Sequence, residues 1–157
     1  MNKIYNIALM GGRGFVGQEI IALIDGHPYF ELTQVFSKSN AGKKIPNYTK
    51  NKHLLFTELD VERRNINPDI DIFILALAND ESKKIVDYIN NNFNDSIVID
   101  VSSDHRFNND WTYRLPETSI DKVMPKKISN PGCYATAMQL ILAPIKKDID
   151  DQVSMMG

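Results

Sequence analysis

The hydrophobic positions of this chain fall into short continuous runs, separated by glycine turns and by stretches with helical spacing. The first run, residues 4–10, is typical of a strand that is buried on both faces of a parallel sheet. After a glycine turn, residues 18–25 carry apolar side chains at helical spacing, and Gly26 is expected to cap that helix. A second strand is predicted at residues 31–36. This order predicts a Rossmann-like α/β fold, doubly wound around a mainly parallel sheet.

The rest of the chain continues this alternation of buried strands and helices. Further elements are predicted at residues 54–56, 71–77 and 96–101 for strands, and at residues 83–89 and from Cys133 through residues 137–145 for helices. Residues 111–117, which are rich in aromatic side chains, are expected to form a loop and the wall of a pocket. In an open α/β sheet, ligands bind at the carboxyl ends of the strands, so polar residues that follow a predicted strand are site candidates.

The glycine turn has the spacing of a dinucleotide-binding motif. It fits G-x-G-x-x-G when read from Gly12 and G-x-x-G-x-x-G when read from Gly11. Both readings let the backbone approach a pyrophosphate next to free N–H groups of a helix. A tight turn without a nucleotide would have the same glycines, but the flanking strand and helix favour a cofactor. The candidate cofactor-binding residues of the turn are Gly11, Gly12, Arg13, Gly14, Phe15, Val16 and Gly17.

The end of the second strand indicates which dinucleotide is bound. Enzymes that use NAD usually have Asp or Glu there, but Ser37 and Lys38 follow the strand here, and residues 35–44 contain no carboxylate. A hydroxyl and a cation can hold a 2′-phosphate, which predicts NADP, although a solvated loop of Lys and Ser has the same composition. Asn79, which follows the strand at residues 71–77, is a further cofactor-binding candidate.

Cys133 is the only cysteine of the chain, and it follows Pro131 and Gly132 at the start of a predicted helix. The positive end of a helix dipole favours the thiolate, which is the nucleophilic form. A lone cysteine can equally be a small buried hydrophobic residue. Upstream, Arg106 carries a guanidinium suited to a carboxylate or phosphate, or to a simple pair with Asp104. The convergence of these features on one sheet edge favours a nucleophile.

Composition narrows the class of protein. A hydrophobic content of 43%, a charged content of 24% and a net charge of −2 are ordinary for a globular domain. They argue against nucleic acid or an anionic membrane as a partner. No apolar run approaches the roughly 20 residues needed to cross a bilayer. One cysteine suits a reducing compartment, and a strand directly after Met1 leaves no room for a leader, so a cytoplasmic location is expected. No metal site is predicted.

Five motifs together resemble N-acetyl-gamma-glutamyl-phosphate reductase, the NADP-dependent enzyme of arginine biosynthesis. The resemblance runs from about Ile7 to the last residue. Its motifs are Gly11 to Gly17, Ser37-Lys38 with Ala41-Gly42-Lys43, Val101 to Phe107, Trp111 with Tyr113 and Leu115-Pro116-Glu117, and Ser129 to Thr136. It implies that the Cys133 thiolate attacks an anionic acyl phosphate and that NADPH reduces the resulting thioester to a semialdehyde. It also implies that Ser103, Arg106 and Asn130 contact the substrate.

The chain departs from the family pattern in places. Ala78 and Asp80 replace a Pro and a Gly, so the loop near the nicotinamide is expected to be less rigid. Arg114 replaces a Gly, Ser103 an Ala and His105 an aromatic residue. Such families run to roughly twice this length, as suits two domains.

That length predicts a fragment in which residues 1–151 form the NADP-binding domain and residues 152–157 begin a truncated substrate and dimerisation domain. The family's catalytic histidine lies in the second half, and His105 is disfavoured as its substitute. The fragment alone is expected to bind NADP weakly and to turn over little.

Two other functions remain open. The chain could belong to an aspartate-semialdehyde dehydrogenase, which resembles this family in fold and cysteine chemistry, although Asn130-Pro131-Gly132-Cys133-Tyr134 favours the glutamyl enzyme. It could also be a non-catalytic NADP-binding module. The intact parent is expected to be a homo-oligomer, and a mitochondrial matrix location is the alternative if it is a fungal bifunctional protein.

Overall fold

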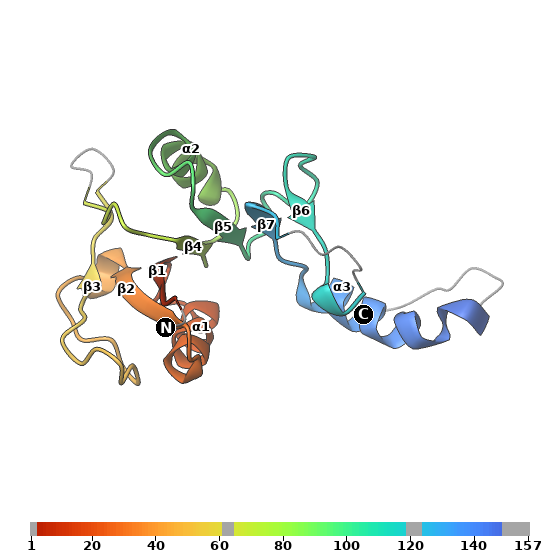
Figure 1. The fold of residues 1–157 in the computed structure, drawn as a ribbon, viewed down its shortest axis with the longest axis horizontal. Coiled ribbons are helices and arrows are strands. Elements are labelled where there is room, and N and C mark those ends of the chain that lie inside the picture. Colours follow the sequence, from red (N-terminus) through yellow and green to blue (C-terminus); the bar gives the residue numbers. More distant parts are fainter. Residues whose placement is uncertain (1–2, 61–64, 119–123, 149–157) are drawn as a thin grey trace.

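The computed structural model describes residues 3–60, 65–118 and 124–148, and its centre is a seven-stranded sheet (Figure 1). The strand order is β3-β2-β1-β4-β5-β7-β6, and each neighbouring pair is parallel. The strands are β1 (Tyr5–Met10), β2 (Phe30–Phe36), β3 (Phe56–Thr57), β4 (Ile72–Leu75), β5 (Ile97–Asp100), β6 (Thr112–Tyr113) and β7 (Lys127–Ser129). The parallel order confirms the predicted fold class.

Three α-helices and three short 3₁₀ helices accompany the described strands. They are α1 (Phe15–Gly26), α2 (Ser82–Asn92), α3 (Cys133–Leu142), η1 (Lys38–Asn40), η2 (Pro116–Thr118) and η3 (Ala143–Asp148). The domain boundary predicted after residue 151, and residues 152–157 beyond it, lie outside the described residues.

The sheet is covered by helices on both faces, because successive side chains of β1 point to opposite sides. Ile7 and Leu9 pack into one core cluster with Ile21 of α1, whereas Met10 packs into a second cluster with Ile89 of α2. All five side chains are buried, and full burial of one such side chain contributes about 1.5–3 kcal/mol. The helices α1 and α2 therefore lie on opposite faces of the sheet, as Figure 1 shows.

The register of the sheet aligns the carboxyl ends of its central strands. Met10 pairs with Phe36 on one side and with Leu75 on the other. Leu75 then pairs with Asp100, and Asp100 pairs with Ser129. The loops after β2, β1, β4, β5 and β7 therefore leave the sheet side by side along one edge. Every site residue predicted from the sequence lies in one of these loops or in the first turn of the helix that follows it.

The prediction that Gly26 caps α1 is wrong. Gly26 is the last helical residue, and its φ is not left-handed; the cap is His27, in an extended conformation, whose N–H donates to the Ile24 carbonyl at 3.1 Å. The ammonium of Lys50 donates to the carbonyls of Ile24, His27 and Phe30. A cation from a distant loop thus satisfies the carbonyl end of the helix, so no left-handed glycine is needed.

The region predicted as an aromatic loop, residues 111–117, contains the strand β6 and the beginning of η2. The indole of Trp111 is buried in the core cluster on the α2 side and stacks on His105, with ring centroids 4.1 Å apart. Pairing of Tyr113 with Ser129 of β7 makes the loop an edge strand. This pairing depends on a distant strand, so local sequence does not reveal it.

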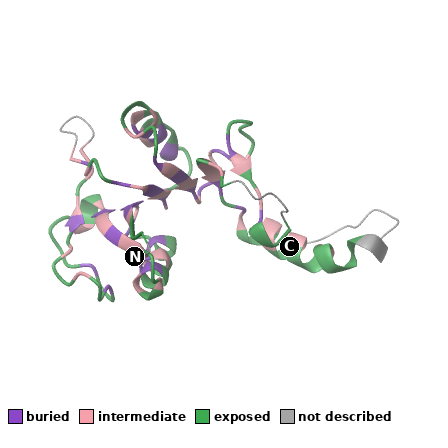
Figure 2. Ribbon diagram, viewed as in Figure 1, coloured by how far each residue is buried: buried purple, intermediate pink, exposed green. Residues whose placement is uncertain are grey.

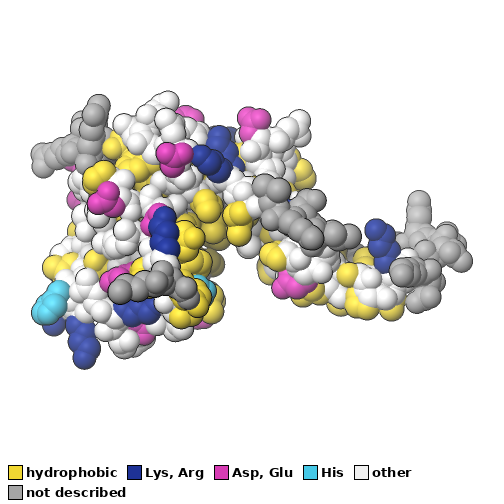
Figure 3. All heavy atoms as spheres, in the orientation of Figure 1, with side chains coloured by type: hydrophobic (Ala, Val, Ile, Leu, Met, Phe, Trp, Pro, Cys, Tyr) yellow, Lys and Arg dark blue, Asp and Glu magenta, His cyan; other side chains and the backbone are white. Residues whose placement is uncertain are grey.

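The last helix, α3, leaves the sheet and extends away from the body of the molecule (Figure 1). None of its residues is buried, and Figure 2 colours most of it as exposed or intermediate. The side chains of Tyr134 and Ile141 are 66% and 59% exposed. Figure 3 shows hydrophobic side chains on the surface of this arm. In the part of the chain that the structure describes, no helix is long and apolar enough to cross a membrane.

Candidate active site

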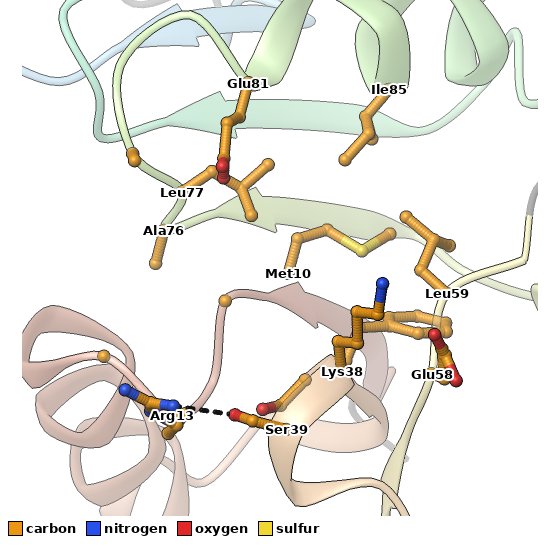
Figure 4. A pocket seen from close by; sticks show the side chains of 15 residues that line it. Met10, Arg13, Lys38, Ser39, Glu58, Leu59, Ala76, Leu77, Glu81 and Ile85 are labelled. Atoms are coloured by element: carbon orange, nitrogen blue, oxygen red, sulfur yellow. Dashed lines mark hydrogen bonds between the residues drawn. The ribbon is translucent and has the colours of Figure 1, made fainter.

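An open cavity of about 940 Å³ lies at the carboxyl edge of β1, β2 and β4 (Figure 4). Its walls are the glycine turn after β1, residues 37–39 after β2, and residues 76–78 after β4. These three loops leave neighbouring strands, so the cavity follows directly from the strand order. The cavity lies where the strand order reverses, because β2 and β3 lie on one side of β1 and β4 lies on the other. This reversal point is the usual ligand crevice of a doubly wound sheet.

The glycines of the turn have different roles. Gly11 has a φ of +82°, and a Cβ there would collide with the carbonyl oxygen of Ala76 in the loop after β4. Gly12 and Gly17 are buried, and a Cβ on Gly17 would collide with the Gly11 carbonyl oxygen. Gly14 is exposed at the cavity as the N-cap of α1, with no such obstruction. The turn is therefore closed by backbone contacts at Gly11 and Gly17 and is open toward the cavity at Gly14.

The other predicted residues of the turn also find places. Arg13 lines the cavity, whereas Phe15 and Val16 begin α1 and are 83% and 50% exposed. The first N–H groups of a helix have no partner within the helix. Gln18 donates a side-chain hydrogen bond of 2.5 Å to the Gly12 carbonyl, which fixes the turn against the helix. The backbone N–H groups at the start of α1 are thus held beside the cavity.

A cationic corner closes the end of the cavity next to β2. Arg13 donates a 2.8 Å hydrogen bond from its guanidinium to the Ser39 hydroxyl, and Lys38 lies on the same side (Figure 4). Ser37 also lines this corner. Two cations and two hydroxyls match the chemistry of a phosphate group. Arg13, which was predicted only as a cofactor-binding residue of the glycine turn, thus lies at the corner where a 2′-phosphate was predicted.

Sequence reasoning missed two carboxylates of this cavity, Glu58 and Glu81. Glu58 follows β3, which lies beside β2 in the sheet, and Figure 4 shows it on the same side of the cavity as Lys38. The signal was present, because Glu58 comes just after the short strand that was predicted near residues 54–56. Only the pairing of Phe36 with Thr57 brings that strand end to the cavity.

The nucleophile candidate Cys133 is the first residue of α3, and its thiol is exposed. Gly132 caps the helix in an extended conformation, and the guanidinium of Arg106 lies against it. A Cβ on Gly132 would come within 2.9 Å of one terminal nitrogen of Arg106. The structure thus brings Arg106 next to the residue that precedes Cys133, although the two lie on loops after different strands.

Arg106 does not pair with Asp104, which was the alternative interpretation. The Asp104 carboxylate instead accepts hydrogen bonds from the N–H groups of Asp80 and Ser82 and from the Ser82 hydroxyl. Within the described residues, the buried Nε of Arg106 has no hydrogen-bond partner. The guanidinium is therefore directed to the start of α3 and is not neutralised by this carboxylate.

The remaining predicted residues lie around this pair. Asn130 donates its N–H to the Asp100 carbonyl at 2.8 Å and its side-chain amide to the Pro131 carbonyl at 3.0 Å. Asn79 is exposed outside the cavity wall, and its side-chain oxygen accepts the Ser103 N–H at 3.1 Å. Asn79 and Ser103 thus tie the loop after β4 to the loop after β5. Their contacts with cofactor and substrate stay predictions.

His105 is buried and stacked on Trp111, and the planes of the imidazole and the indole are 9° from parallel. This packing agrees with the expectation that His105 is not the partner of Cys133. It also explains why an imidazole can replace an aromatic residue at this position, since a flat ring fills the same space against the indole.

Comparison with known proteins places this geometry in a family. The model described as "Semialdehyde dehydrogenase, NAD binding domain" matches residues 6–124. The chain belongs to this family. Protein ARG5,6, mitochondrial, of Candida albicans is 41% identical over 96% of this chain and 18% of its own length. The N-acetyl-gamma-glutamyl-phosphate reductase of Xanthomonas campestris pv. campestris (strain 8004) is 37% identical over 91% of this chain and 46% of its own length. The predicted resemblance to these reductases is confirmed.

Solved structures agree with the fold. Aspartate semialdehyde dehydrogenase II of Vibrio cholerae, complexed with ASA, matches with a TM-score of 0.77 at 21% identity, over 94% of this chain and 48% of that chain. Aspartate semialdehyde dehydrogenase of Candida albicans, solved with NADP, matches with a TM-score of 0.71 at 19% identity, over 92% and 48%. The chain therefore spans less than half the length of these relatives.

Proposed function

We propose that this chain is the cofactor-binding and cysteine-bearing part of an NADPH-dependent N-acetyl-gamma-glutamyl-phosphate reductase. The observation that carries the proposal is the position of the Arg106 guanidinium against Gly132, directly before the exposed Cys133. An acyl phosphate substrate needs a nucleophile and a cation side by side, and this pair supplies both. The names of the bacterial relatives, which share 36–39% of their aligned residues with this chain, support the same substrate.

The residues around the cavity fit NADPH. The backbone of Gly14 and the start of α1 would hold the pyrophosphate, and Arg13 with Lys38 would hold the 2′-phosphate. When bound, this cofactor supplies a hydride, that is, two electrons and a proton, to a carbonyl carbon. The chain itself contributes the placement, because residues 76–78 line the cavity and Asn79, directly after them, accepts a hydrogen bond from Ser103 in the loop that carries Arg106.

Cys133 would act in two steps. Its thiolate attacks the carbonyl carbon of the acyl phosphate, a C–S bond forms, and the C–O bond to phosphate breaks with release of orthophosphate. After reduction of the thioester carbonyl, the oxyanion collapses, the C–S bond breaks, and the semialdehyde leaves with regeneration of the thiolate. Backbone N–H groups in the first turn of α3 would stabilise the oxyanion. Arg106 would bind the anionic group of the substrate.

The complete reaction needs the intact protein, which we propose to contain a catalytic histidine and a substrate domain beyond this chain. In this proposal the intact protein is a homo-oligomer, is cytoplasmic, and binds neither nucleic acid nor membrane. The name of the Candida relative places that protein in mitochondria, so a mitochondrial matrix location is the alternative for this one. Light scattering of the purified protein tests the oligomeric state, and fractionation of source cells tests the location.

The test of function is an assay of the intact protein in the reverse direction. N-acetylglutamate semialdehyde, phosphate and NADP⁺ should give NADPH, whereas aspartate semialdehyde should give a kcat/KM lower by at least about a hundredfold. Preference for aspartate semialdehyde would assign the chain to the related dehydrogenases. If neither semialdehyde supports reduction of NADP⁺ while NADPH binds tightly, the protein is a non-catalytic module and the proposal is overturned.

Cofactor choice has its own test. Lys38→Ala should raise the KM for NADPH about tenfold or more and leave the KM for NADH nearly unchanged, because only NADPH carries the 2′-phosphate. Lys43→Ala is the matched control, since Lys43 is also exposed in the connection between β2 and β3 but does not line the cavity. Equal effects on both cofactors would contradict the assignment of Lys38.

A further inference from the structure

A chain of hydrogen bonds connects the centre of the sheet to the loop that carries Arg106. It starts at Asp100, the last residue of β5, whose carboxylate is fully buried. This carboxylate accepts the N–H of Ser102 at 3.0 Å and its hydroxyl at 2.9 Å. The same Ser102 oxygen then accepts the N–H of Asp104 at 3.1 Å. The backbone of Asp104 is thereby anchored to the sheet.

The side chain of Asp104 extends this chain to a second loop. Its carboxylate accepts the Asp80 N–H at 2.8 Å, the Ser82 N–H at 3.1 Å and the Ser82 hydroxyl at 2.7 Å. These donors lie at the start of α2, where N–H groups have no partner within the helix. With the bond between Asn79 and Ser103, four hydrogen bonds join the loop after β4 to the loop after β5.

The loop after β4 needs this support, because Asp80 has a left-handed backbone with a φ of +68°. Such a conformation costs a non-glycine residue about 1–2 kcal/mol, and the family usually has a glycine there. The hydrogen bond from the Asp80 N–H to Asp104 holds the residue in place. Hydrogen bonds to the Asp104 carboxylate thus support the loop in place of the missing Pro and Gly, and its lower rigidity stays a prediction.

The two loops that Asp104 joins belong to the two halves of the proposed site. Ala76, Leu77 and Ala78 of the first loop form a wall of the cofactor cavity. In the second loop, Arg106 lies two residues after Asp104 and reaches Gly132 beside Cys133. Of these four hydrogen bonds between the two loops, three end on the Asp104 carboxylate and one ends on the side-chain oxygen of Asn79.

We propose that Asp104 is a positioning residue that sets the distance between the cofactor cavity and the cysteine–arginine pair. The inference rests on the proposed function, and it concerns placement only, because Asp104 touches neither Cys133 nor the cavity. Loss of its carboxylate lets the wall of the cavity move relative to the thioester. A shift of about 1 Å between reacting groups can cost about a hundredfold in rate.

The test compares Asp104→Ala with Asp25→Ala in the intact protein. Asp25 is a matched control, because its carboxylate also accepts several hydrogen bonds, from the N–H and hydroxyl of Thr49 and from the N–H of Lys50. It lies in the last turn of α1, at the end of that helix away from the cavity. Asp104→Ala should slow single-turnover hydride transfer about a hundredfold, while alkylation of Cys133 stays within about twofold. Asp25→Ala should lower the melting temperature and leave hydride transfer unchanged.

A second variant and a second measurement complete the test. Asp80→Gly in the Asp104→Ala background should restore part of the hydride-transfer rate, because glycine adopts a positive φ without strain. Amide hydrogen exchange of residues 76–82 should accelerate in Asp104→Ala and not in Asp25→Ala, and this measurement does not depend on activity. Unchanged exchange, or hydride transfer within about threefold of wild type in Asp104→Ala, overturns the role of Asp104. An inactive wild-type protein would instead refute the proposed function, and the exchange data would still decide the placement.

Discussion

The helices α1 and α3 begin in the same way and are stabilised differently. Each follows a glycine in an extended conformation, Gly14 with a ψ of 162° and Gly132 with a ψ of 165°. Both start at the same edge of the sheet, and neither has an acidic residue in its first turn. However, α1 buries Ile21 and Ile24 in the core, whereas α3 buries none of its residues.

The difference lies in what a glycine near the start of each helix, Gly17 in α1 and Gly132 before α3, allows to approach. At α1, Gly17 lets one piece of backbone pack against another, the carbonyl of Gly11, and this contact is rigid. At α3, Gly132 makes room for the guanidinium of Arg106, the far end of a flexible side chain. The glycine turn is therefore closed by backbone contacts, while the candidate cysteine site depends on a long side chain at the start of an exposed helix.

The largest expected effect separates chemistry from packing. Cys133→Ser in the intact protein should lower kcat by at least about a thousandfold, because a hydroxyl is a far weaker nucleophile than a thiolate near neutral pH. The melting temperature should not change, since the thiol is exposed. Steady-state kinetics and calorimetry of the same sample test both statements. A variant that keeps more than about a tenth of the activity would remove Cys133 from the mechanism.

The next effect measures the difference in packing directly. Ile21→Ala in α1 should lower the free energy of unfolding of this chain by about 2–5 kcal/mol, because it leaves a cavity in the core. Ile141→Ala in α3 should cost less than about 0.5 kcal/mol, because that side chain is mostly exposed. Urea titrations of both variants provide the numbers. Equal losses would mean that α3 is packed in solution.

Substitution of Gly17 should cost stability, whereas substitution of Gly132 should cost mainly activity. Gly17→Ala should destabilise the protein by about 1–3 kcal/mol and weaken NADPH binding, because its methyl group meets backbone that cannot move. Gly132→Ala should change stability by less than about 0.5 kcal/mol but lower kcat/KM about tenfold, because only Arg106 must shift. Gly26→Ala is the control, with no atom within 4 Å of its Cβ and an expected gain of about 0.5–1 kcal/mol. Fluorescence titration with NADPH and thermal unfolding distinguish the three variants.

The smallest effect is a pH dependence of stability that comes from Asp104, in the loop after β5. Partial burial raises the pKa of Asp104, but the hydrogen bonds from Asp80 and Ser82 outweigh it, so the pKa of Asp104 lies below its usual value. A depressed pKa stabilises the fold above the unfolded pKa of about 3.9, and this stability is lost as pH falls through the lower, folded pKa. Asp104→Asn should therefore flatten the acid side of the curve of stability against pH. An unchanged curve would contradict the role of its hydrogen bonds.

Local sequence was enough to predict the core of the fold. The apolar runs and the glycine turn predicted β1, α1 and β2 nearly at their observed bounds, since these depend on short-range periodicity and on steric limits near glycine. Local sequence failed at Gly26, because Lys50, 24 residues later in the chain, donates to the Ile24 carbonyl at the end of the helix. It also failed at Tyr113, because pairing with the distant strand β7 turns the predicted loop into an edge strand.

The sequence alone determined which groups this protein has for chemistry: a glycine turn, a basic loop without a carboxylate after β2, and one cysteine after a glycine. Only the tertiary structure decided how they meet. The aligned ends of β1, β4, β5 and β7 bring Arg106 to Gly132, and the same register brings Asp104 to Asp80. Residues some 24 positions apart bond to each other here, and strand order and register, which no local pattern encodes, determine which of them are neighbours.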